Sequence, residues 1–278
     1  MRFHRVRVVR RIPHPEIGFT QGLIAEWGGA DGGSSVWEST GQYGLSTLRR
    51  YPAGAGVPAA EVELPNELFG EGICRVSDAI WQLTWRERTA LRWDATTLEL
   101  QEQIRYNREG WGMCAVGGAT SPPEVITSDG TSELVRRDPV MLEPREVVHV
   151  RCQGRRVLGL NDLTWAGGLV WANVAGTDCL AGIDLASGEI TDVVDARAAA
   201  ERHWGNPQAI MNGIAALAAP GEFLLTGKEW KFIRQVRLEP DRDRGQINRL
   251  LSGVFRLTII VSQLGALVVC DFAPFCPK

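Results

Sequence analysis

Five short, related segments carry most of the residues of this chain that could do chemistry. Each places a polar or aromatic residue before a small or turn-forming residue and an aliphatic one: Gln21-Gly22-Leu23, Glu71-Gly72-Ile73, Trp111-Gly112-Met113, Asn161-Asp162-Leu163 and Asn212-Gly213-Ile214. Glu71 is best suited to reactive chemistry, because a carboxylate can take up and release a proton and the flanking Gly70 and Gly72 let the backbone and a ligand come close. The side-chain amides of Gln21 and Asn161 can donate and accept hydrogen bonds.

The positions of these segments indicate a repeated unit. Their middle residues stand at positions 22, 72, 112, 162 and 213, which are about 40–50 residues apart. A second series of short apolar stretches starts at positions 36, 80, 125, 169 and 223, in step with the first. Periods of this size are typical of repeat architectures in which each unit is one supersecondary element.

The two series predict an all-β fold, a five-bladed β-propeller in which Gly-rich turns join several short strands in each blade. The innermost strands of such a fold line a central channel, so we expect the polar residues of the five segments to meet at one mouth of it. Residues 3–12 are predicted to be an outer strand of the last blade that closes the ring. Residues 195–203 are predicted to form a short helix.

The repeat also predicts the domain organisation. Residues 1–238 are expected to form the one propeller domain, which carries the site, and residues 239–278 a C-terminal extension of unknown role. The extension contains an apolar run, 254–269, that is interrupted by Arg256. This run is short of the roughly 18–20 uncharged residues that a membrane span needs, so we expect a packed amphipathic segment and no association with a membrane.

The composition excludes several classes of protein. A hydrophobic share of 44% and a charged share of 23% are ordinary for a soluble globular chain, and a net charge of −3 gives no reason to expect a nucleic-acid partner. The six cysteines form no CxxC pair and the four histidines are scattered, so no zinc-site spacing is present. We expect buried free thiols, with Cys74 and Cys114 in neighbouring blades. No signal peptide is visible at the Arg-rich N-terminus.

Nine segments together give the chain a family resemblance. In order along the chain they are Phe19-Thr20-Gln21-Gly22-Leu23, Glu38-Ser39-Thr40-Gly41-Gln42-Tyr43-Gly44, Phe69-Gly70-Glu71-Gly72, Leu83-Thr84-Trp85, Gly110-Trp111-Gly112, Ser128-Asp129-Gly130, Asn161-Asp162-Leu163, Asn212-Gly213-Ile214-Ala215 and Thr226-Gly227-Lys228-Glu229-Trp230. This pattern resembles the plant and bacterial type of glutaminyl-peptide cyclotransferase over about residues 12–238. Lys231 departs from it, because the family usually has Pro there, and the tail is longer than the pattern requires.

The resemblance implies a five-bladed propeller and an activity. The expected enzyme converts the N-terminal glutaminyl residue of a peptide or protein to pyroglutamate with release of ammonia, by general acid–base catalysis without a catalytic metal or other cofactor. It implies a secreted or periplasmic enzyme, although a cytoplasmic one remains open because no export signal is visible. We expect the protein to be a monomer.

The resemblance implies the acid–base role of Glu71 and favours a pocket role for three Trp residues, and the chemistry of the other side chains suggests their roles. Glu71 is expected to carry the proton, Lys228 and Asn161 to polarise the oxygen of the substrate's side-chain amide, and Gln21 to orient that amide. Three indoles are expected to wall the substrate pocket: those of Trp85, Trp111 and Trp171. Asn212 and Asp129 are expected to shape turns.

Less specific roles for the same residues stay open at this point. Glu71 could pair with a neighbouring blade, Lys228 could be a solvated residue at a strand end, and Asn161 and Gln21 could serve turns. The three Trp could simply pack between blades.

Two other functions fit parts of the pattern. Glu71, Asn161, Asn212 and Asp162 could imitate the calcium ligands of a propeller lactonase or related hydrolase, although Ca²⁺ usually takes more oxygen ligands than this set offers. A non-catalytic propeller could instead use a Trp-lined mouth to bind a peptide terminus or a sugar.

Overall fold

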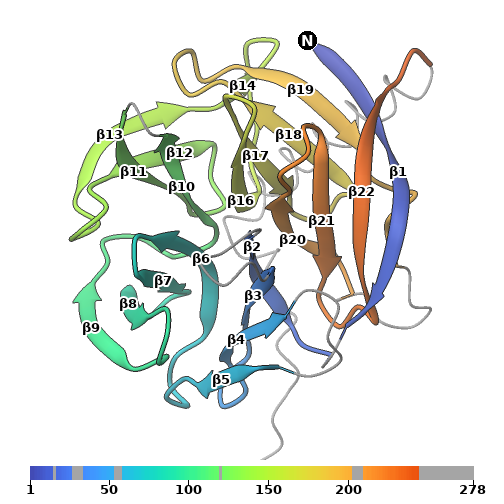
Figure 1. The fold of residues 1–278 in the computed structure, drawn as a ribbon. Helices are drawn as coiled ribbons and strands as arrows, with labels where there is room; N and C mark the ends of the chain where they lie inside the picture. The colour runs from blue at the N-terminus through green and yellow to red at the C-terminus, as the bar shows by residue number, and fades with distance from the viewer. Residues whose placement is uncertain (15–16, 27–33, 53–57, 119–120, 202–208, 244–278) are drawn as a thin grey trace, which may run out of the picture.

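The chain folds into β-sheets arranged around a centre (Figure 1). The computed structural model describes residues 1–14, 17–26, 34–52, 58–118, 121–201 and 209–243, and every regular element within these ranges is a β-strand. The expected all-β class is therefore confirmed for the part of the chain that the structure describes. Within these same ranges, no helix has the length and apolar character needed to cross a membrane.

Three antiparallel sheets of four strands follow one another in the first half of the chain. The first contains β2 (Thr20–Glu26), β3 (Ser35–Thr40), β4 (Thr47–Pro52) and β5 (Ala60–Glu63). The second contains β6 (Gly70–Val76), β7 (Ala79–Thr84), β8 (Thr89–Asp94) and β9 (Leu100–Arg105). The third contains β10 (Met113–Gly118), β11 (Ser121–Ser128), β12 (Glu133–Arg137) and β13 (Pro144–His149).

The second half of the chain, joined by the N-terminal strand, forms an eight-stranded sheet. Its order is β16 (Leu160–Ala166), β17 (Leu169–Val174), β18 (Cys179–Ile183), β19 (Ile190–Asp195), β1 (Arg2–Pro13), β22 (Phe232–Pro240), β21 (Glu222–Gly227) and β20 (Met211–Ala216). A separate hairpin consists of β14 (Arg151–Cys152) and β15 (Arg155–Arg156).

Strand β1 confirms the outer strand predicted at residues 3–12, since it pairs antiparallel with β22. It also pairs parallel with β19 over Arg2–Arg5, which was not expected. Asp192 of β19 explains this second pairing, because its carboxylate accepts a hydrogen bond from Arg2 (2.8 Å) and bonds the His4 ring (2.7 Å). The pairing gives β19 a partner on its outer edge.

The innermost strands are β2, β6, β10, β16 and β20, and each contacts the next, with β20 returning to β2 (Figure 1). The glycines of the repeated segments make this approach possible. A Cβ atom at Gly72 would lie 2.6 Å from the carbonyl oxygen of Trp111, and one at Gly112 only 2.0 Å from that of Asn161. The repeated glycines therefore mark where neighbouring inner strands touch.

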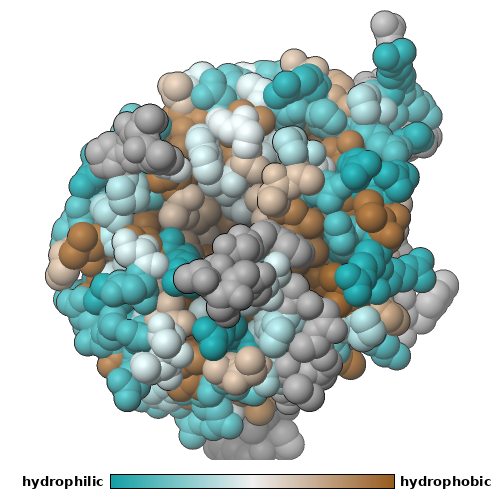
Figure 2. All heavy atoms as spheres, in the orientation of Figure 1, coloured by the Kyte–Doolittle hydropathy of each residue, from teal (hydrophilic) through white to brown (hydrophobic). Residues whose placement is uncertain are grey.

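The apolar core lies between neighbouring sheets. Trp37 packs between the first and second sheets and Trp81 between the second and third, and both are fully buried. On the face shown in Figure 2, hydrophilic residues cover most of the outer edge of the molecule.

The helix expected at residues 195–203 is not found in the described part of that range. Strand β19 runs to Asp195, and a turn follows in which the N–H groups of Ala199 and Ala200 donate to carbonyls three residues earlier. The Asp195 carboxylate accepts the backbone N–H of Arg197, which is the bond of an Asx turn. Only one turn forms over the described residues of that range, and a single isolated turn does not offset the cost of nucleating a helix. Residues 202–203 of that prediction and the apolar run at 254–269 lie outside the described residues.

Candidate active site

Three polar side chains from three inner strands form a chain of hydrogen bonds at one end of the ring. Gln21, Glu71 and Asn212 are each the second residue of their strand, in β2, β6 and β20, and all three are buried. Gln21 Nε2 donates to Glu71 Oε1 (2.9 Å), and Asn212 Nδ2 donates to Gln21 Oε1 (2.7 Å). The convergence expected from the repeat is therefore present for these residues.

Glu71 is a buried carboxylate, with 4% of its surface exposed. Burial raises the pKa of Glu71 well above the usual value of 4.5, because it removes water from the charged form. The nearby charge of Lys228 opposes this effect, whereas the carboxylates of Glu87, Glu109 and Asp162 reinforce it. The result is a group that can hold or release a proton closer to neutral pH than an ordinary Glu can.

Lys228 brings a buried cation to the same place. It directly follows β21, and its backbone N–H donates to the carbonyl of Ile210 (2.9 Å). Its Nζ atom lies 4.4 Å from the centre of the Phe19 ring, a distance at which the ring face attracts a cation. Lys228 is 8% exposed, so it is not the solvated strand-end lysine that the sequence left open.

Trp85 and Trp111 lie together in one cluster beside this site, with Ala175 and the partly buried Phe69. Phe69 contacts Trp85 (ring centres 5.4 Å apart) and Phe19 (6.2 Å). The buried Nε1 of Trp85 has no hydrogen-bond partner in the structure. These rings form a continuous aromatic wall. It ends at Phe19, the ring that contacts the Lys228 cation.

Trp171 lies elsewhere, which corrects its expected place with the other two indoles. In the register of β16 and β17 it pairs with Thr164, three residues beyond Asn161 and toward the other end of β16. Its indole donates to the carbonyl of Ala166 (3.1 Å) and packs against Phe223 (ring centres 5.3 Å apart). Trp171 therefore belongs to the core between the two halves of the eight-stranded sheet.

Asn161 and Asp162 begin β16 and have different surroundings. The Oδ1 atom of Asn161 is buried and has no hydrogen-bond partner in the structure. Asp162 Oδ2 accepts the backbone N–H groups of Ile214 (2.8 Å) and Leu23 (3.2 Å), from two other inner strands. Asp162 thus holds inner strands together, while the Asn161 amide oxygen can accept a hydrogen bond from a ligand.

Sequence reasoning missed several members of the site. Asn212 was expected to shape a turn, but its side chain holds Gln21, the residue at the same place in the first segment. Phe19 and Phe69 each stand two residues before a site residue, a spacing that could have identified them. Asp129 does shape a turn, since its carboxylate accepts the N–H of Thr131 (3.1 Å).

Among the described residues, no three His, Cys, Asp or Glu side chains gather in a way that could hold a metal ion. Cys74 on β6 and Cys114 on β10 are buried free thiols on neighbouring inner strands that contact each other, as expected. Cys270 and Cys276 lie outside the described ranges.

Comparisons with known proteins agree on one family. The family model described as glutamine cyclotransferase matches residues 1–238. The chain is similar to a glutaminyl-peptide cyclotransferase of Arabidopsis thaliana, with 30% identity over 244 residues that cover 86% of this chain and 72% of the relative. It is also similar to the crystal structure of Myxococcus xanthus glutaminyl cyclase, with a TM-score of 0.76 and 30% identity, over 87% of this chain and 99% of that one.

Proposed function

The chain belongs to the glutamine cyclotransferase family, and we propose that the site around Glu71 is where it performs the family's reaction. It is an enzyme that converts an N-terminal glutaminyl residue of a peptide to pyroglutamate. The observation that carries the assignment of the site is the buried Glu71 carboxylate, held by Gln21 and placed near the Lys228 cation.

The reaction makes simple demands on the protein. The α-amine of the substrate attacks the carbon of its own side-chain amide, the five-membered lactam closes, and the C–N bond to the amide nitrogen breaks to release ammonia. Because the attack is intramolecular, the protein mainly holds a reactive conformation and moves protons. An α-amine has a pKa of about 8, so much of it arrives as ammonium at neutral pH.

Glu71 is suited to move those protons. Its carboxylate takes a proton from the attacking nitrogen, and the resulting acid gives a proton to the departing amide nitrogen, which leaves as ammonia. Its raised pKa favours both steps, because a general acid–base group works best when its pKa lies near the working pH. The hydrogen bond from Gln21 fixes the orientation of the carboxylate.

The remaining groups hold and polarise the substrate amide. Lys228 provides positive charge for the oxygen of the tetrahedral intermediate, and charge placed there in advance stabilises the transition state. Asn161 contributes its side-chain amide, whose unpartnered Oδ1 accepts an N–H of the substrate. Gln21, itself held by Asn212, orients the substrate amide beside Glu71.

Trp85 and Trp111 form the apolar wall of the site. Their indoles enclose the short glutaminyl side chain and exclude water from the reacting groups. The unpartnered Nε1 of Trp85 adds a hydrogen-bond donor to this wall. We assign Trp171 to core packing.

We propose that the architecture is a five-bladed propeller. In this interpretation the eight-stranded sheet is two four-stranded blades joined through β1 and β19, and the three other sheets are one blade each. The cyclic contacts of the innermost strands support it. The catalytic unit then comprises residues 1–238, with residues 239–278 as an extension of unknown role.

Four further properties of the enzyme are proposals: its oligomeric state, its substrates, its partners and its location. We propose a monomer that takes peptide or protein substrates, has no nucleic-acid or membrane partner, and acts in a secreted or periplasmic location. Each proton transfer above is assigned to a side chain of this chain, so we propose no cofactor.

An ammonia-release assay with the wild-type protein tests the reaction. The purified protein is given glutamine amide, a Gln-peptide amide, and the same peptide with an acetylated N-terminus. We expect ammonia together with pyroglutamyl amide from the first and the pyroglutamyl peptide from the second, and neither kind of product from the third, because acetylation removes the nucleophile. Ammonia from the acetylated peptide would show an amidase and contradict the proposal.

A further inference from the structure

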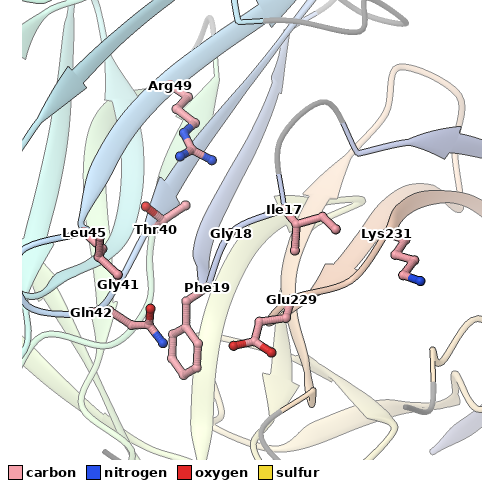
Figure 3. A pocket seen from close by; sticks show the side chains of 10 residues that line it. All are labelled: Ile17, Gly18, Phe19, Thr40, Gly41, Gln42, Leu45, Arg49, Glu229 and Lys231. Atoms are coloured by element: carbon pink, nitrogen blue, oxygen red, sulfur yellow. The ribbon is translucent and has the colours of Figure 1, made fainter. Parts of the chain in front are cut away.

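A pocket of about 570 Å³ lies next to the candidate active site (Figure 3). It is formed by the same segments that carry the site. Ile17 and Phe19 lead into Gln21 on β2, Gln42 and Leu45 follow the end of β3, and Glu229 directly follows Lys228. Phe19 belongs to both places, because it lines the pocket and also contacts the Lys228 cation.

Backbone geometry singles out two residues of this pocket. Gln42 has φ of 90° and Glu229 has φ of 59°, in the left-handed region that side chains other than Gly rarely adopt. Backbone hydrogen bonds hold both positions, since Leu45 N–H donates to Gln42 O (3.0 Å) and Glu229 N–H donates to Gly18 O (2.8 Å). Such outliers gather at ligand clamps, where the surrounding structure maintains them.

The side chains of Gln42 and Glu229 point toward the Phe19 ring from either side, while Lys231 lies apart from it (Figure 3). Among the interactions of the described residues, the Gln42 side-chain amide makes no hydrogen bond, so it is available to the backbone of an extended peptide. Arg49, deeper in the pocket, is paired with Glu61 (2.8 Å).

The rim of the pocket is apolar and exposed. Leu45 is 67% exposed and Ile17 is 53% exposed, and both line the pocket. Large apolar side chains that are exposed together mark places where something else binds. Ile17 stands four residues before Gln21, so this apolar rim lies on the chain segment that enters the candidate site.

We propose that this pocket binds the substrate residues that follow the N-terminal glutaminyl residue, and that it favours an apolar side chain at one of the next two positions. The inference rests on the proposed function. An extended peptide advances about 3.3 Å per residue, so the second and third residues pass Phe19. Gln42 then bonds the peptide backbone, and Ile17 and Leu45 contact the apolar side chain.

The test compares kcat/KM for three substrates: glutamine amide, Gln-Leu-Leu-amide and Gln-Ser-Ser-amide. We expect the wild type to prefer the Leu peptide over the Ser peptide by about tenfold. Leu45→Ala should reduce that preference by about threefold, and the double variant Ile17→Ala/Leu45→Ala should abolish it. Turnover of glutamine amide should stay unchanged in both variants. Leu100→Ala, an exposed Leu on β9, is the matched control and should keep the preference.

Gln42→Gly tests the backbone contact separately, because Gly tolerates the left-handed conformation. It should lower kcat/KM for both peptides by about three- to tenfold relative to glutamine amide. A wild type that turns over glutamine amide without preferring the Leu peptide, or a preference that survives in the double variant, would overturn this inference alone. A wild type that releases no ammonia from glutamine amide would overturn the proposed function, and this inference with it.

Discussion

Two opposing influences act on Glu71. Burial and three neighbouring carboxylates favour its protonated form, and Lys228 favours its charged form. A buried carboxylate without a cation would stay protonated and could not accept a proton from the substrate. A fully exposed one would be too weak a base at neutral pH. Lys228 therefore limits the rise that burial causes in the pKa of Glu71, as the proposed role of Glu71 as both base and acid requires.

Lys228→Gln tests this balance. Lys228 lowers the pKa of Glu71, so its removal should raise that pKa further and move the acidic limb of the kcat/KM profile to higher pH. Loss of the charge that faces the developing oxyanion should also reduce kcat by about 10²-fold. The measurement is the pH–rate profile with glutamine amide. Lys231→Gln is the control, since that side chain points away from Phe19 (Figure 3); an unchanged profile for Lys228→Gln would contradict the assignment.

The two tryptophan positions predict opposite phenotypes. Trp111→Ala should raise KM for glutamine amide by about tenfold. The substrate would lose apolar surface that it buries against the indole, and tenfold corresponds to about 1.4 kcal/mol of binding free energy. Trp171→Ala should leave KM unchanged and lower the free energy of unfolding by about 3–5 kcal/mol, because it empties part of the core. Kinetics and urea denaturation of both variants separate the two. A KM effect of similar size in Trp171→Ala would return that residue to the site.

The geometry of the candidate site could be predicted from the sequence only in part. The repeat placed Gln21 and Glu71 at equivalent positions, and they do meet. Asn212 holds the same position in the last segment, yet its partner could not be foreseen, because a hydrogen bond depends on which way each side chain turns. Trp171 was misplaced because its distance along β17 from the mouth depends on strand register, which the sequence alone does not fix.

The inner strands set how closely the site residues can approach. Gly72 and Gly112 let one strand lie directly on the next, which is why small residues recur beside the functional ones. Only Asp162 breaks this pattern, and its carboxylate replaces the lost contact with hydrogen bonds to Leu23 and Ile214. The repeated segment is thus a packing motif as well as a carrier of polar side chains.

Gly112→Ala tests the packing role. The added methyl group would lie 2.0 Å from the carbonyl oxygen of Asn161, so two inner strands must separate. We expect a loss of at least about 3 kcal/mol in the free energy of unfolding, as for severe overpacking, together with reduced activity. Gly154→Ala is a control with open space around the new methyl group and only backbone strain to bear. Equal stability of Gly112→Ala and the wild type would contradict the motif.

One strand of each repeat could be predicted because the apolar stretches recur in step. Strands β3, β7, β17 and β21 each start within one residue of the predicted positions 36, 80, 169 and 223. The turn after Asp195 was mistaken for a helix, since the Ala residues there favour a helix locally, whereas the described residues form only one turn with bonds to carbonyls three residues earlier. The parallel pairing of β1 with β19 could not be predicted either, because it depends on Asp192 meeting Arg2 and His4 across the closed molecule.

Closure of the ring depends on contacts among the segment after β1, the segment before β22 and the first sheet. His14, just after β1, lies between the last strands and the first sheet. Its Nδ1 bonds the carbonyl of Trp230 (2.9 Å), and its Nε2 bonds the buried Glu38 carboxylate of β3 (3.2 Å). Glu38 also accepts hydrogen bonds from Thr20 (2.5 Å) and Tyr51. This buried network joins the first and last strands of the ring.

The network predicts a pH dependence of stability. Burial alone would lower the pKa of His14, but the charge and hydrogen bond of Glu38 outweigh it and raise that pKa above the usual 6.5. The folded state therefore binds the proton more tightly than the unfolded state does. The stabilisation is complete below about pH 6.5 and is lost as pH rises through the folded-state pKa.

Denaturation of His14→Gln at several pH values checks this prediction. The variant should be less stable than the wild type by about 3 kcal/mol at pH 6, and the difference should shrink as pH rises. His149→Gln, at an exposed histidine, is the control. A difference that grows with pH would contradict the sign of the linkage.

We propose that strands far apart in the chain assemble one site whose proton carrier is Glu71. The most direct test is kcat for ammonia release from glutamine amide by Glu71→Gln, with Glu63→Gln on exposed β5 as control. We expect a fall of about 10²–10⁴-fold for Glu71→Gln, with unfolding at neutral pH no easier than in the wild type, since the change removes a buried carboxyl group and keeps an acceptor for Gln21. A folded Glu71→Gln variant within a few-fold of the wild-type rate would contradict the account.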